Sequence, residues 1–95
     1  MEGVVTEFHF VNPHAFLVID VQRQPWKLEM DNLSELVDVG MTKETFRTGD
    51  RVIVRGNRAR EKSQQALYIR KLDRPADGFQ YEQAGTSPRI NFKPR

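Results

Sequence analysis

The stretch EGVVTEFHFVNPHAFLVIDV, residues Glu2 to Val21, decides the fold. It holds two extended apolar segments separated by Asn12-Pro13-His14. Proline has no amide hydrogen and keeps the preceding residue out of the helical region, so the first segment ends there. The second segment, Ala15 to Val21, is nearly all apolar and is typical of a central strand covered on both faces. We therefore predict a β-hairpin to which the rest of the chain adds strands.

Further strands and one helix are expected downstream. Residues 26–31 alternate apolar and polar side chains, which indicates a strand whose polar face, with Glu29 and Asp31, is solvated. Asn32 is expected to cap a short helix, because Glu35 follows three residues later as in a capping box. Residues 51–56 and 66–72 are expected as the fourth and fifth strands, joined by a polar, basic loop. We expect the core to include Trp26, Leu28, Leu36, Val52 and Val54.

The element order β-β-β-α-β-β predicts an all-β fold. It fits a small five-stranded OB-like barrel with one short helix between the third and fourth strands. An SH3-like barrel or an open α+β sheet remains as an alternative. We expect one barrel domain over residues 1–82, with Phe79 and Tyr81 in a last short strand. A flexible tail is expected over residues 83–95, because that segment contains glycine and proline and few apolar side chains.

Composition and charge limit the classes of protein that fit. The 95 residues form one domain with a modest core. The absence of cysteine excludes disulfides and thiolate metal sites. No apolar run approaches the roughly 20 residues of a membrane span, so no transmembrane segment is expected. The charge is uneven: residues 1–50 carry a balance of −5 and residues 51–95 a balance of +7. Such asymmetry fits either a polyanion-binding face or self-complementary strands.

Three short motifs follow one another along the chain: VNPHAF (residues 11–16), GMTKETF (residues 40–46, closed by Gly49-Asp50) and GNRAR (residues 56–60). In order and spacing they resemble a family of small bacterial exported domains of unknown function with an Asn-Pro-His signature. The chain departs from the family at Met41, where tryptophan is usual, and at Thr48, where proline is usual. The family's export signal and histidine-rich leader do not stand in these 95 residues, so the cytoplasm is kept as the alternative expectation to export. The resemblance implies an OB-like barrel in the periplasm and implies no reaction.

A basic group suggests one possible ligand. Cations gather on the fourth and fifth strands and the loop between them, and in OB folds that loop forms one wall of the nucleic-acid cleft. Tyr68 is the aromatic residue embedded among them, and exposed aromatics stack bases in single-strand binders. The candidate binding residues for single-stranded nucleic acid are Arg55, Arg58, Arg60, Lys62, Tyr68 and Arg70. The alternative interpretation is an ordinary solvated face, which also includes Arg51, Lys71 and Arg74.

The two histidines suggest a second possible ligand. If Asn12-Pro13 forms a tight hairpin tip, which requires a cis turn, His9 faces Phe16. His9 and His14 then become diagonal neighbours about 7–8 Å apart, with Glu7 on the same face. Two imidazoles and a carboxylate could bind Zn²⁺ or Cu²⁺. In the alternative interpretation His14 orders the turn and His9 is a surface residue.

Signals for catalysis are weak. There is no cysteine, the serines lie in helix-start or loop contexts, and no glycine loop suited to phosphate is present. Glu29 and Asp31 are expected on the solvated face, where neither gains the raised pKa of an acid catalyst. We therefore expect no enzyme activity and no cofactor. The sequence favours a non-enzymatic accessory or binding domain with an unknown ligand or protein partner. We expect it in the periplasm by resemblance, with the cytoplasm as the alternative.

Overall fold

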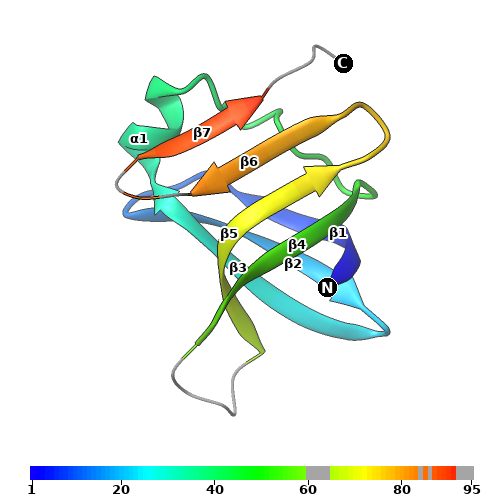
Figure 1. The fold of residues 1–95 in the computed structure, drawn as a ribbon. Helices are drawn as coiled ribbons and strands as arrows, with labels where there is room; N and C mark the ends of the chain where they lie inside the picture. Colours follow the sequence, from blue (N-terminus) through cyan, green and yellow to red (C-terminus); the bar gives the residue numbers. More distant parts are fainter. Residues whose placement is uncertain (60–64, 84, 86, 92–95) are drawn as a thin grey trace.

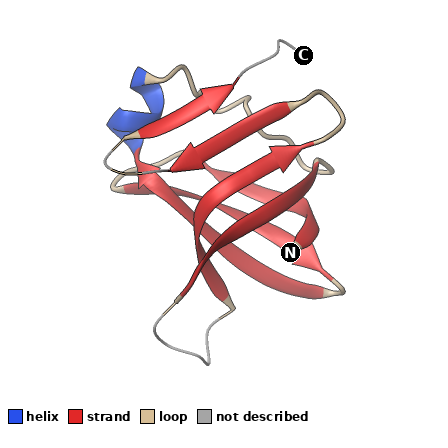
Figure 2. Ribbon diagram, viewed as in Figure 1, coloured by secondary structure: helices blue, strands red, loops and turns tan. Residues whose placement is uncertain are grey.

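The computed structural model describes residues 1–59, 65–83, 85 and 87–91 (Figure 1). Strands dominate it, and one short helix accompanies them in the described part of the chain (Figure 2). The elements are β1 (Glu2–His9), β2 (His14–Val21), β3 (Gln24–Asn32), α1 (Leu33–Asp38), β4 (Arg51–Arg58), β5 (Ala66–Arg74), β6 (Phe79–Gln83) and β7 (Pro88–Asn91).

The strands form one sheet that closes partly on itself. Its order is β3-β2-β1-β4-β5-β6-β7, and β3 also pairs in parallel with β5. This additional pairing joins Lys27–Glu29 to Ala66–Tyr68 and turns β1 to β5 into a ring. In Figure 1, β4 and β5 cross in front of β1 to β3, while β6 and β7 extend the sheet beyond the ring, beside α1. Closing the ring removes most of the exposed strand edges.

The predicted all-β fold is confirmed, as is the helix between the third and fourth strands. The number of strands was wrong, because the described residues form seven strands instead of five. The predicted flexible tail also needs correction, since Pro88–Asn91 forms β7 and pairs with β6. Pro88 is buried at the first position of this edge strand, where its missing amide hydrogen removes no essential bond. Ile90 then packs against the core and holds the strand in place.

The opening hairpin forms as the sequence indicates. His9 lies directly opposite Phe16, and the Asn12–Pro13 peptide bond is cis. Beyond β3, the Asn32 side chain accepts a hydrogen bond from the Glu35 backbone N–H at 2.9 Å and donates one to the Glu35 carboxylate at 2.6 Å. The first bond is the N-cap bond of the predicted capping box, while the Glu35 carboxylate returns to the Asn32 side-chain amide instead of the Asn32 backbone N–H. Local side-chain chemistry therefore fixes both the first turn and the start of α1.

The core lies inside the ring and beneath β6. Of the five residues predicted for it, Leu28, Leu36, Val52 and Val54 are buried. Trp26 is the exception, because it is only partly buried and packs against the edge of the core. It faces Ile19 close to the β2–β3 turn, where the ring ends. The interior is completed chiefly by Val5, Leu17, Ile19, Met30, Phe46, Ile69, Leu72, Phe79 and Tyr81.

Arg74 is also inside, although the sequence placed it in the solvated basic group. Its side chain is 2% exposed. It donates two hydrogen bonds to the Asp77 carboxylate, at 2.9 and 2.8 Å, and one to Asp50 at 3.2 Å. The guanidinium lies over the ring of Phe79, 4.7 Å from its centroid. Arg74 therefore ties the turn after β5 to the turn before β4.

Candidate ligand-binding cleft

A cleft of about 160 Å³ opens on the outside of the ring where β3, β4 and β5 meet. It exists because β3 pairs with β5 over only three positions, beside the end of the β4–β5 hairpin. Lys27 and Glu29 on β3 lie on one side, joined by a 3.7 Å salt bridge. The other lining residues are Asn57, Arg58, Ala59, Ala66, Leu67 and Tyr68. The cleft thus combines both signs of charge with an aromatic ring.

Two arginines lie over aromatic rings around this cleft. The Arg58 guanidinium is 5.3 Å from the centroid of the Trp26 ring. The Arg70 guanidinium is 5.6 Å from that of Tyr68. Such contacts stabilise by roughly 0.5–1 kcal/mol at exposed sites. Both arginines stay exposed, so each guanidinium remains accessible to a ligand.

The candidate binding residues thus divide into three groups. Arg58 and Tyr68 line the cleft, and Arg70 joins them through its contact with Tyr68. Arg55 is exposed further back along β4. Arg60 and Lys62 lie outside the described residues.

Phe16 contributes a third aromatic–cation contact beside the cleft. His9, on β1, stacks on its ring with centroids 4.4 Å apart and planes inclined by 13°. Lys27, on β3, places its ammonium 4.6 Å from the same ring centroid. Since β1 and β3 flank β2, Phe16 is covered by both neighbouring strands. The sequence gives no sign of this, because Phe16 stands in an apolar run that predicts a buried strand.

The structure joins two of the three predicted metal ligands. His9 Nε2 and a Glu7 carboxylate oxygen are 2.9 Å apart, on an exposed part of β1. His14 instead stands opposite Asn32 at the start of β2. In the ranges that the structure describes, no three His, Cys, Asp or Glu side chains gather into a group suited to a metal. Metal binding through these residues stays a prediction.

Asp31 is the site residue that sequence reasoning placed wrongly. Its side chain is 7% exposed, not solvated. It accepts hydrogen bonds from the Tyr81 hydroxyl at 2.6 Å, the Gln83 amide at 3.0 Å and the Tyr68 hydroxyl at 3.2 Å. The cause is a β-bulge: between the pairs His14–Asn32 and Phe16–Glu29, β3 has one residue more than β2. A bulge breaks strict alternation, so Met30 and Asp31 are both buried.

The Asp31 network fixes Tyr68 at the cleft. Burial, followed by the charge of Asp31, raises the pKa of the Tyr68 hydroxyl. Burial and the hydrogen bond to Asp31 raise the pKa of Tyr81 far more strongly. Both hydroxyls therefore stay protonated donors at neutral pH and hold β5 and β6 against the end of β3. The Tyr68 ring is consequently preorganised beside the cleft.

The family described as "Family of unknown function (DUF6152)" matches residues 1–68, and the chain belongs to this family. The match runs from β1 into β5 and includes the cleft residues of β3 and β4. No curated protein and no solved structure matches the chain. The predicted membership of a family of unknown function is confirmed, while export and the Asn-Pro-His signature stay predictions. No helix in the described residues is long and apolar enough to cross a membrane.

Proposed function

We propose that the chain is a non-enzymatic, OB-like binding domain whose ligand occupies the cleft between β3, β4 and β5. The ring of five strands, with α1 between β3 and β4, supports the OB-like assignment. OB domains bind oligonucleotides and oligosaccharides on strands 2 and 3 and on the loops at the ends of the first and last hairpins. The cleft borders the corresponding strand and hairpin. For a ligand other than nucleic acid, the resemblance of the three sequence motifs to exported domains supports a periplasmic location.

One observation favours single-stranded nucleic acid as the ligand. The contacts of Arg58 with Trp26 and of Arg70 with Tyr68 place two guanidinium groups and two aromatic rings at or beside one cleft, which Arg58 and Tyr68 line. Bases stack on aromatic rings and guanidinium planes, and phosphates pair with the same arginines. Every base has a flat face, so recognition of this kind tolerates different sequences. A nucleic-acid ligand would favour the cytoplasm over the periplasm as the place of action.

The test is a titration of a fluorescent oligothymidylate followed by anisotropy. Phosphate contacts through Arg58 and Arg70 alone predict that log K falls with log salt with a slope of about −1.4, and each further contact steepens it by about 0.7. Arg58→Gln should weaken binding strongly, because it removes a charge and a stacking plane together. Arg47→Gln is the matched control, since Arg47 is also exposed but lies in the turn before β4. Absence of binding at low salt, or an equal loss in both variants, would refute nucleic acid as the ligand.

A further inference from the structure

A second β-bulge shapes the surface next to the cleft. Arg55 on β4 pairs with Lys71 on β5, but the following residue, Gly56, pairs with Ile69. Arg70 is therefore an extra residue in β5 without a partner on β4. Ile69 is buried, whereas Arg70 and Lys71 are both exposed. The bulge thus turns two consecutive cations toward solvent, where a regular strand would expose only one.

Gly56 permits this arrangement. A Cβ atom built on Gly56 would lie 2.1 Å from the Tyr68 carbonyl oxygen, far inside van der Waals contact. Only glycine lets β4 approach β5 so closely at the bulge. Tyr68, which lines the cleft, and the bulged residue Arg70 are two residues apart on β5, and their side chains are in contact. The cleft and the bulge are therefore adjacent on the surface of β5.

The exposed cations beside the bulge repel one another. Arg55 and Lys71 stand directly opposite each other and are both exposed, and like charges in this position destabilise a sheet. Over the described ranges, no salt bridge joins Arg55, Arg70 or Lys71 to an acidic residue. Such a cluster has unused capacity for an anion.

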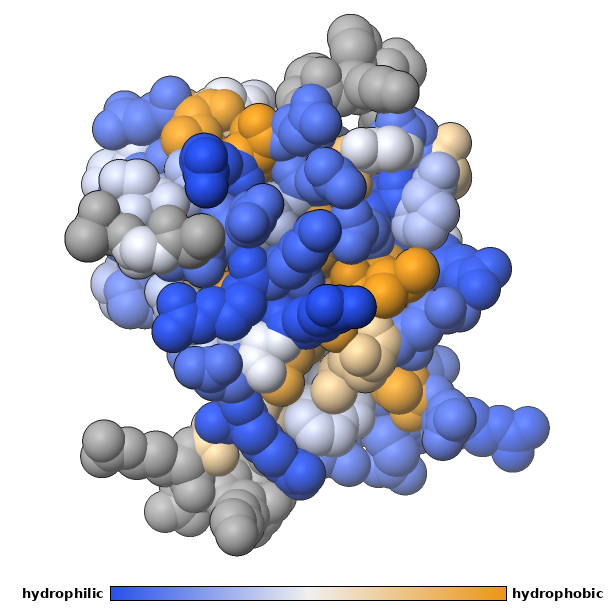
Figure 3. Space-filling view, viewed as in Figure 1, coloured by the Kyte–Doolittle hydropathy of each residue, from blue (hydrophilic) through white to orange (hydrophobic). Residues whose placement is uncertain are grey.

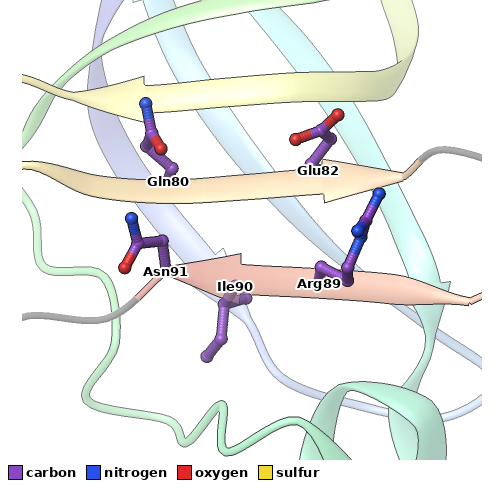
Figure 4. A pocket seen from close by; sticks show the side chains of 5 residues that line it. All are labelled: Gln80, Glu82, Arg89, Ile90 and Asn91. Atoms are coloured by element: carbon purple, nitrogen blue, oxygen red, sulfur yellow. The ribbon is translucent and has the colours of Figure 1, made fainter.

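The neighbouring strands add one acid and one further cation. Glu82 on β6 lies opposite Lys71, and Arg89 on β7 lies opposite Glu82. Both side chains project from these adjacent strands beside a hollow of about 300 Å³ (Figure 4). The visible face over β5 and β6 is mainly hydrophilic (Figure 3). Asp73 adds a second carboxylate on this face, where it accepts a hydrogen bond from Gln80. The four cations Arg55, Arg70, Lys71 and Arg89 still outnumber the two carboxylates, so the face stays positive, as an anion site requires.

We propose that Arg55, Arg70 and Lys71 form a phosphate-binding cluster that holds the backbone of the strand whose bases lie at the cleft. The inference rests on the proposed nucleic-acid ligand. Asn57, which lines the cleft opposite Tyr68, follows Arg55 by two residues on the same face, which is about 7 Å along a strand. A chain of a few nucleotides can span both, within the 4–16 nucleotides that one OB fold covers. The affinity for the strand then has two sources, base contacts at the cleft and phosphate contacts at the bulge.

The experiment uses two probes, oligothymidylate and inorganic tripolyphosphate, which has no bases. The double variant Arg55→Gln/Lys71→Gln should bind oligothymidylate about tenfold or more weakly and lower the salt slope by about 1.4, for two lost contacts. It should also lose tripolyphosphate binding, while its melting temperature stays equal or rises because the like-charge pair is gone. The control Lys43→Gln/Arg47→Gln removes the same charges from the exposed turn before β4 and should bind both probes as the wild type does.

The outcomes separate this inference from the proposed function. If Arg58→Gln weakens oligothymidylate binding but Arg55→Gln/Lys71→Gln does not, the cleft binds nucleic acid and the cluster is overturned. If the wild type ignores oligothymidylate but binds tripolyphosphate through Arg55 and Lys71, the nucleic-acid proposal fails and the phosphate site stands. If the cluster variant and the control variant lose the same affinity for the probes, the effect comes from net charge alone, and the inference is overturned.

Discussion

Replacement of the buried Arg74 by methionine should destabilise the domain more than any single surface change. The side chain is 2% exposed, and its guanidinium bonds to Asp77, to Asp50 and to the carbonyl oxygen of Thr45. Methionine fills much of the volume but leaves these acceptors without their cation. Breaking a buried pair in this way costs about 3–5 kcal/mol. A domain of this kind has about 5–15 kcal/mol in total, so Arg74→Met should be close to marginal stability.

Arg51→Met provides the matched control for this prediction. Arg51 also pairs with a carboxylate, that of Glu2, but its side chain is 67% exposed. An exposed pair of this kind contributes at most about 1 kcal/mol. Urea denaturation followed by tryptophan fluorescence measures both variants, provided the slope m stays constant. A loss below about 1 kcal/mol for Arg74→Met, or a loss equal to that of Arg51→Met, would refute the structural role given to the buried arginine.

Three further predictions concern the cleft and its support. Gly56→Ala should lower the free energy of unfolding by about 1–3 kcal/mol or more, as overpacking does. It should also weaken oligonucleotide binding, because the new methyl group displaces the Tyr68 backbone. Unchanged stability by urea denaturation would contradict the close approach of Gly56 to Tyr68. Tyr81 should stay protonated at pH 10 in the folded protein, because burial and its bond to Asp31 raise its pKa strongly, and the pKa of Tyr68 should lie above its ordinary value. The stability from these shifts is fully present below the unfolded pKa of about 10 and is lost as pH rises through the folded pKa values. Tyrosinate absorbance at pH 10 as large in the folded as in the unfolded protein would argue against the Asp31 network. Trp26→Ala should cost about 2 kcal/mol, less than the 3–5 of a fully buried aromatic, and a loss of 4 or more by calorimetry would place Trp26 inside the core.

The elements that local chemistry controls could be predicted from the sequence. Proline and asparagine fix the first turn, Asn32 and Glu35 cap α1, and alternating apolar side chains identify Leu28, Val52 and Val54 as core. These features depend on residues close in sequence, so a single chain is enough to reveal them.

What could not be predicted depends on contacts between distant strands. The bulges that bury Asp31 and expose Arg70 beside Lys71 arise from register shifts, and alternation alone gives no sign of a register shift. Arg74 looked like its basic neighbours, although Asp77 is three residues away, because Asp50 and the Thr45 carbonyl oxygen become close only in the folded chain. β7 was missed for the same reason, since its short, polar segment forms a strand only against β6.

The candidate site was predicted in part. Arg58, Tyr68 and Arg70 are brought together at the cleft, as the basic hairpin suggested. Trp26 was assigned to the core and Phe16 to a strand covered on both faces, yet each contacts a cation at the surface. Large aromatics in a small domain usually belong to the core, and only the position of Trp26 next to the β2–β3 turn indicates the edge of the ring.

The most direct test of the cleft as the ligand site is a map of amide chemical shifts in ¹⁵N-labelled protein titrated with oligothymidylate at low salt. We expect the largest changes at Lys27, Asn57, Arg58 and Tyr68, extending to Arg70 and Lys71, and reversal of these changes as salt is added. The turn over residues 43–49 should be unaffected. Changes that centre on that turn, or no changes at all, would contradict the assignment of the cleft as the ligand site.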